Sequence, residues 1–216
     1  MQRLVLFDLD DTLIDRRRAL EGALDRFASR HGLTADARAS MLTLLAERAS
    51  VDHFSMIREA HGLATCPRDL WQDYLSDMAA FASCQAGVLA GLDELMARGW
   101  RVGVATNGSA DIQRAKLDTT GIVRHVHAVC ISEEIGVRKP DPRLFSTAAG
   151  LCGAVPGDGG WMVGDDAVKD IAGGRSAGLA TLWIGDPLQW PTPVRTADRT
   201  APSALLAIRL LLELPD

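Results

Sequence analysis

Short apolar runs recur along the chain, and most are separated by helical patterns. This alternation limits the possible folds more than any other feature of the sequence. Runs of roughly four to eight apolar residues that end in polar clusters indicate buried strands. The predicted strands are residues 4–9, 100–105, 126–131, 161–163 and 180–184, and the predicted helices are 89–98, 110–119, 143–151, 170–177 and 203–214. This order predicts an α/β fold with a doubly wound parallel sheet.

Residues 16–83 depart from this alternation. Apolar residues recur at helical spacing, as at Leu20, Leu24 and Phe27, and no strand pattern is present. We therefore expect an all-helical inserted domain at 16–83 and a core formed by 1–15 and 84–216. Because the insertion follows the first strand, we expect it to cover the sheet edge where α/β folds bind ligands, as a lid.

The composition excludes several classes of partner. A net charge of −5 and a pI near 5.5 argue against a nucleic acid polymer or an anionic membrane as partner. The four cysteines form no CxxC pair, so we expect reduced thiols and neither a zinc site nor a disulfide framework. The sequence shows no signal-peptide pattern and no apolar run of about 18 residues, so we expect a cytoplasmic protein. As a separate expectation, the protein is a monomer or a homodimer.

Acidic clusters follow the first and fourth predicted strands. Asp8 and Asp10 come after the first strand, and Asp165 comes after the fourth. Because parallel strands bring these ends to one edge, the carboxylates would repel one another unless a cation lay between them. Hard oxygen ligands favour Mg²⁺. The sequence therefore predicts a magnesium site at this edge, with Asp165 as a direct ligand.

Asp8 and Asp10 have the spacing of a catalytic pair. Residues two apart project to the same side of an extended chain, so one carboxylate can attack phosphorus while the other handles protons. On its own, such a pair equally indicates a turn or a helix cap. The other polar clusters favour catalysis.

Thr106, Asn107 and Gly108 follow the second strand and offer a hydroxyl, an amide and backbone N–H groups at a helix start, a suitable cradle for a phosphate group. Asn-Gly is also a hairpin signal, but the helical pattern that follows disfavours a hairpin. Lys139 precedes a predicted helix start at Asp141. It could neutralise both nucleophile and phosphate. Its spacing alone favours a solvated surface lysine, and only its combination with the other clusters favours a role in the site.

Two further acids have roles that the sequence leaves open. Asp166 could cap the following helix or bind the metal through water, and Asp170 could orient Lys139 from outside the metal shell.

The segments FDLDDTL, VGVATNG, ISEEIGVRKPDPRLF and MVGDDAVKDIAGGRSAG, in this order, resemble the four sequence motifs of the haloacid dehalogenase superfamily. The resemblance implies a Rossmann-like core with the helical cap of the family's first subclass, close to its phosphatase and nucleotidase branch. It also implies that Asp8 is the nucleophile and a Mg²⁺ ligand. Asp10 would be the general acid/base and bind Mg²⁺ through its main-chain carbonyl. Thr106 and Lys139 would contact the phosphoryl group, and Asp165 would be the third protein ligand.

The expected activity is Mg²⁺-dependent hydrolysis of a small phosphorylated metabolite, such as a nucleoside monophosphate or a sugar phosphate, through an aspartyl-phosphate. One alternative is a hydrolytic 2-haloacid dehalogenase, but dehalogenases of this superfamily lack the aspartate that stands here as Asp10. A phospho-acceptor module without turnover is a second alternative. It is disfavoured because receiver domains carry the acceptor on a middle strand and have no helical insertion.

Overall fold

The computed structural model describes residues 2–47, 49–155, 157–191 and 193–215. The chain forms two compact units. The sheet unit contains Met1–Ile14, Cys84–Ala110 and Gly121–Asp216, and the helical unit contains Asp15–Ser83 and Asp111–Thr120. The last of these segments differs from the sequence expectation, which assigned all of 84–216 to the core. It groups with the helical unit because Ile112 packs into that unit's apolar cluster. The roles of the two units as catalytic core and cap remain predictions.

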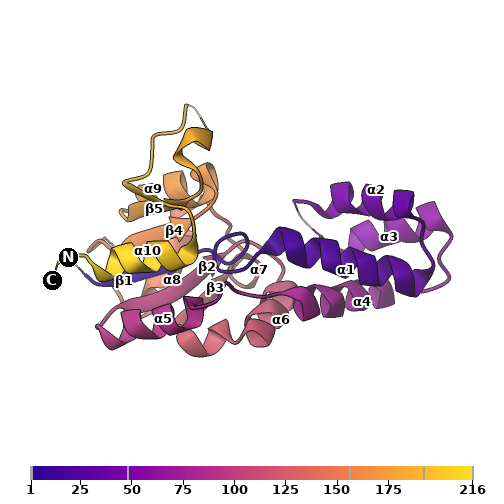
Figure 1. The fold of residues 1–216 in the computed structure, drawn as a ribbon, viewed down its shortest axis with the longest axis horizontal. Helices are drawn as coiled ribbons and strands as arrows, with labels where there is room; N and C mark the ends of the chain where they lie inside the picture. Colours follow the sequence, from indigo (N-terminus) through magenta and orange to yellow (C-terminus); the bar gives the residue numbers. More distant parts are fainter. Residues whose placement is uncertain (1, 48, 156, 192, 216) are drawn as a thin grey trace. The chain divides into compact units, whose positions relative to one another are not determined.

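Within the described residues, the sheet unit contains one parallel sheet of six strands in the order β3-β2-β1-β4-β5-β6 (Figure 1). The strands are β1 (Leu4–Phe7), β2 (Arg101–Thr106), β3 (Ala128–Ile131), β4 (Trp161–Gly164), β5 (Ala180–Ile184) and β6 (Arg199–Ala201). The register places Phe7 beside Val104 of β2 and Val163 of β4. The predicted doubly wound α/β fold is confirmed. Sequence analysis missed β6 because this short strand buries only Ala201 and carries no apolar run.

Helices cover both faces of the sheet. On one face, α5 (Val88–Ala97) and α10 (Ala204–Leu212) pack together, and on the other α8 (Pro142–Leu151) lies on β1, β2 and β3. Leu4 and Leu6 join the apolar cluster beneath α8, so Val5 and Phe7 point to the opposite face. All four residues of β1 are buried, as expected for a central parallel strand.

Shorter helical segments connect several strands. They are η1 (Ile122–His125), α7 (Ser132–Ile135), η2 (Ala167–Ala172), α9 (Gly173–Ser176) and η3 (Pro187–Gln189). The helix predicted at 170–177 thus consists of the π-helical η2 followed by the short α9. All four cysteines are free thiols, and Cys130 and Cys152 are buried. No helix among the described residues combines the length and the apolar character needed to cross a bilayer.

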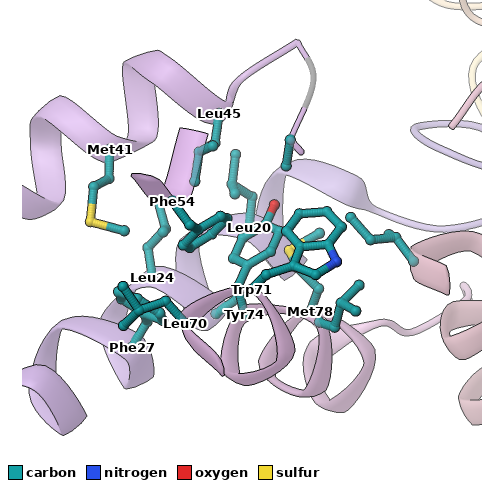
Figure 2. Close-up of a cluster of buried hydrophobic side chains, with 14 of the residues drawn as sticks. Leu20, Leu24, Phe27, Met41, Leu45, Phe54, Leu70, Trp71, Tyr74 and Met78 are labelled. Atoms are coloured by element: carbon teal, nitrogen blue, oxygen red, sulfur yellow. The ribbon is translucent and has the colours of Figure 1, made fainter. Parts of the chain in front are cut away.

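The helical unit has an aromatic core. It contains α1 (Arg16–His31), α2 (Ala35–Leu45), α3 (Val51–His61), α4 (Pro67–Phe81) and most of α6 (Ala110–Thr120). Figure 2 shows the buried side chains of this core, with Phe54 among its aromatic rings. The Phe54 ring centroid lies 5.7 Å from that of Phe27, 5.6 Å from Trp71 and 5.1 Å from Tyr74, within the range of favourable aromatic pairs. These contacts join α1, α3 and α4 around one cluster.

One buried carboxylate also links α1 to α4. The Asp77 side chain is 1% exposed and accepts two hydrogen bonds from the Arg30 guanidinium, at 2.7 and 2.8 Å. Arg26 lies 3.7 Å from the same carboxylate. The paired guanidinium groups offset the cost of removing this charge from water.

Candidate active site

The site begins where the central strand ends. Asp8 directly follows β1, is 7% exposed, and its N–H donates to the Val163 carbonyl at 2.9 Å. The chain then turns, and Asp11 takes a positive φ of 57°, a conformation that aspartate tolerates better than most residues. Asp10 lies in this turn and is partly exposed. The main chain of Asp8 is therefore held by the sheet, whereas Asp10 belongs to the loop that follows β1.

Lys139 is buried beside Asp8. Its Nζ lies 2.6 Å from Asp8 Oδ1 and 2.6 Å from Asp170 Oδ1, and its side chain is 2% exposed. The loop that carries Lys139 ends where Asp141 caps α8 by accepting from the Arg143 N–H. The reading of Lys139 as a solvated surface lysine is thus wrong, because two carboxylates from distant parts of the chain compensate its buried charge.

Three carboxylates form a compact acidic cluster. Oxygen atoms of Asp8, Asp165 and Asp170 all lie within 4.8 Å of one another, and the set is made of the hard oxygen donors that suit Mg²⁺. Both Asp170 oxygens have protein partners, since Oδ1 accepts from Lys139 and Oδ2 from the Asp166 N–H at 3.0 Å. The cluster therefore fits a cation, and the carboxylates of Asp8 and Asp165 are better placed than that of Asp170 to bind one.

Gly164 makes room for this cluster. A Cβ atom at this position would overlap the Asp170 carboxylate, so no larger residue fits without displacing that side chain. Asp166 has a separate role, because its Oδ1 accepts from the N–H groups of Val168 and Lys169 and caps η2. Asp166 thus caps η2 and Asp170 contacts Lys139, while binding of the metal by Asp166 through water remains a prediction.

Burial and crowding shift Asp8 and Asp165 toward the neutral form. Burial raises the pKa of Asp8 to about 8, with Lys139 opposing the shift and the neighbouring acids adding to it. Burial and the Asp170 charge raise the pKa of Asp165 to about 7. Burial works to lower the pKa of Lys139, but the Asp170 and Asp8 carboxylates outweigh it and raise that pKa. A group of acids in this state gains from a bound cation.

The second strand supplies the other polar residues. Thr106 is the fully buried last residue of β2. Asn107 forms two hydrogen bonds with the main chain of Lys139, accepting from its N–H at 2.8 Å and donating to its carbonyl at 3.1 Å. The Gly108 N–H donates to Ser132 Oγ at 3.1 Å. The predicted phosphate cradle is therefore braced by its neighbours, and its role toward substrate remains a prediction.

Comparison with known proteins places the chain in a family. The family model for haloacid dehalogenase-like hydrolases matches residues 2–178. The chain belongs to this family. A glyceraldehyde 3-phosphate phosphatase from Methanopyrus kandleri is 32% identical over 85% of this chain and 84% of its own length. A phosphoserine phosphatase from Thermus thermophilus is 40% identical, but the match spans 50% of this chain and only 43% of that protein.

Solved structures share the fold of this chain. The hydrolase YfnB from Bacillus subtilis, solved bound to magnesium, superposes with a TM-score of 0.77 at 21% identity, covering 97% of this chain and 98% of YfnB. An identity this low supports the haloacid dehalogenase-like fold alone.

Sequence analysis missed several residues of this haloacid dehalogenase-like site. Ser132 directly follows β3 and binds Gly108, and Glu133 accepts from the Ala110 N–H at 2.8 Å. Thr12 Oγ1 lies 3.4 Å from Asp165 Oδ1. Position could have revealed Ser132, since it stands at a strand end just as Asp8 and Thr106 do. The contact between Thr12 and Asp165 has no comparable signal, because these residues are far apart in the sequence.

Proposed function

We propose that the protein is a Mg²⁺-dependent phosphomonoesterase that hydrolyses a small phosphorylated metabolite through an aspartyl-phosphate on Asp8. The buried contact of Lys139 with both Asp8 and Asp170, at 2.6 Å each, carries the proposal. Phosphoryl transfer to an aspartate requires a carboxylate nucleophile next to a positive charge. Asp8 lies beside the Lys139 ammonium group, and the Asp165 carboxylate is close by.

The residues suit a resident Mg²⁺ ion. Asp8 and Asp165 would hold it through their carboxylates and Asp10 through its main-chain carbonyl. When bound, the ion supplies positive charge that favours ionised Asp8 and offsets the charge on the phosphoryl oxygens.

Two half-reactions follow from these assignments. In the first, an Asp8 oxygen attacks phosphorus, the bond from phosphorus to the leaving oxygen breaks, and the Asp10 carboxyl group donates a proton to that oxygen. In the second, Asp10 accepts a proton from a water molecule that attacks the same phosphorus. The bond between Asp8 and phosphorus then breaks, phosphate leaves, and Asp8 is regenerated. Lys139 and Thr106 hold phosphoryl oxygens in both steps, and the braced loop at Asn107 and Gly108 lines the same region.

The names of the two relatives agree with small phosphate esters as substrates, since one is a phosphoserine phosphatase and the other a glyceraldehyde 3-phosphate phosphatase. Nucleoside monophosphates and sugar phosphates belong in the same screen. Cell fractionation and size-exclusion chromatography would test the predicted cytoplasmic location and monomeric or homodimeric state.

The direct test is hydrolysis of p-nitrophenyl phosphate with Mg²⁺ or with EDTA. We expect Mg²⁺-dependent turnover in the wild type and none in Asp8→Asn. Asp158→Asn, which alters an exposed acid of the same unit, should retain full activity. Hydrolysis by Asp8→Asn in EDTA would refute the proposal.

A second experiment tests the role of Asp10. Because p-nitrophenolate leaves with little need for a proton, Asp10→Asn should release one burst of p-nitrophenol, no larger than the amount of protein, and then stall as the phosphorylated protein. Sustained phosphate release by the wild type excludes a stoichiometric phospho-acceptor. Halide release from a 2-haloacid without phosphate release would instead indicate a dehalogenase.

A further inference from the structure

Trp183 bonds directly to the main chain of a proposed metal ligand. It stands in β5 beside Gly164 of β4, and its indole Nε1 donates to the Asp165 carbonyl at 2.6 Å. The residue is 6% exposed. The contact therefore joins the interior of the sheet to the residue that follows β4.

Two neighbouring residues contact the Trp183 indole ring and restrict its movement. The Trp190 ring meets it edge-on, with centroids 4.9 Å apart and planes at 88°, and Trp190 is itself anchored by donating to the Val194 carbonyl at 2.8 Å. Gly185 lies against the Trp183 ring so closely that a Cβ atom there would overlap it. These two contacts restrict rotation of the Trp183 indole.

Both the side-chain carboxylate and the main-chain carbonyl of Asp165 therefore have protein partners. Thr12 Oγ1 approaches its carboxylate at 3.4 Å, and Trp183 binds its carbonyl. Rotation of this peptide group would move the carboxylate relative to Asp8, and the bond to a fixed indole opposes that rotation. Groups that orient metal ligands in this way affect metal affinity without touching the metal.

We propose that Trp183 is a positioning residue that orients Asp165 for Mg²⁺ binding, an inference that rests on the proposed function. Trp183→Phe keeps an aromatic ring and removes the N–H donor. We expect its Mg²⁺ dissociation constant, measured by calorimetry without substrate, to rise about 10-fold. The KM for Mg²⁺ should rise by a similar factor, while kcat at saturating Mg²⁺ stays near the wild-type value.

Trp100→Phe is the matched control. It changes another buried tryptophan of the sheet unit and leaves Trp183 and its Trp190 neighbour in place, so its Mg²⁺ affinity should match the wild type. Equal affinity of Trp183→Phe and wild type would overturn the inference and leave the phosphatase proposal intact, even if the variant were less stable. Failure of the wild type to bind Mg²⁺ would overturn both.

A measurement on the wild type applies even if Trp183→Phe does not fold. The Trp183 indole N–H resonance should shift on Mg²⁺ saturation, whereas that of Trp71, which lies in the core of the helical unit, should not. An unchanged Trp183 resonance would contradict the inference.

Discussion

The side-chain amide of Asn107 forms one hydrogen bond in each direction with the main chain of Lys139, at 2.8 and 3.1 Å. This pairing ties the end of β2 to the loop before α8, across 32 positions of sequence. Asn107 therefore determines where the Lys139 backbone lies, and thereby where its ammonium group meets Asp8.

Asn107→Ala tests this relationship. Loss of both bonds should let Lys139 move from Asp8 and lower kcat/KM for p-nitrophenyl phosphate roughly 10- to 100-fold. Thr147→Ala, which removes an exposed hydroxyl from α8, should leave kcat/KM unchanged. Wild-type activity in a folded Asn107→Ala protein would show that Lys139 needs no such support.

Gly164→Ala tests the packing beneath the acidic cluster. The added methyl group would overlap the Asp170 carboxylate, so we expect a loss of about 1–3 kcal/mol in the free energy of unfolding, together with weaker Mg²⁺ binding. Gly150→Ala is the control, because no described residue outside the surrounding helix backbone comes within 4 Å of the added carbon and the position is helical. That change should stabilise the protein by about 0.5–1 kcal/mol in urea denaturation. Normal Mg²⁺ affinity in Gly164→Ala would contradict the expectation.

Arg30→Ala tests the buried charge of the helical unit. Among the described residues, the Asp77 carboxylate would keep Arg26, at 3.7 Å, as its one cationic partner, so we expect a loss of about 3 kcal/mol in the free energy of unfolding, measured in urea. Arg17→Ala breaks an exposed pair with Glu21 on the same helix and should change stability by less than about 1 kcal/mol. Equal losses of unfolding free energy in the two variants would mean that the burial of Asp77 does not make its ion pair with Arg30 more stabilising than an exposed one.

The acidic cluster predicts a characteristic pH dependence. Because the pKa values of Asp8 and Asp165 are raised to about 8 and about 7, the metal-free folded state keeps protons that the unfolded chain releases near pH 4. These two groups therefore lower the free energy of unfolding as pH rises from about 4 to 8.

Mg²⁺ should reverse this loss, because it binds the deprotonated carboxylates. We expect the increase in Tm on adding Mg²⁺, relative to EDTA, to be larger at about pH 8 than at about pH 6. The difference should shrink in Asp165→Asn. An increase that did not depend on pH would refute the assignment of these acids.

The strand ends were predictable because each combines an apolar run with the polar residues that follow it. This pattern located Asp8, Thr106 and Asp165 correctly at the ends of β1, β2 and β4. The short β6 lacks an apolar run. The π-helical form of η2 was not foreseen because its 6 residues are too few for apolar spacing to separate a π-helix from an α-helix.

The contacts around these strand ends were less predictable. Lys139 is buried because residues from two distant segments compensate its charge, and spacing along the chain carries no information about such partners. Family resemblance placed Lys139 near Asp8, but it did not indicate that the amide of Asn107 binds the Lys139 main chain. Trp183 was not singled out within the predicted strand 180–184, because hydropathy does not reveal what an indole N–H will bind.

The central position of β1 has a consequence for biosynthesis. β1 is made first, yet its two neighbours in the sheet are β2, which begins at Arg101, and β4, which begins at Trp161. Asp15–Ser83, by contrast, is continuous and contains most of the aromatic core of its unit. We therefore expect these helices to fold on the ribosome before β1 pairs with β2 and β4, so that Asp8, the proposed nucleophile, is synthesised early and reaches its final position late.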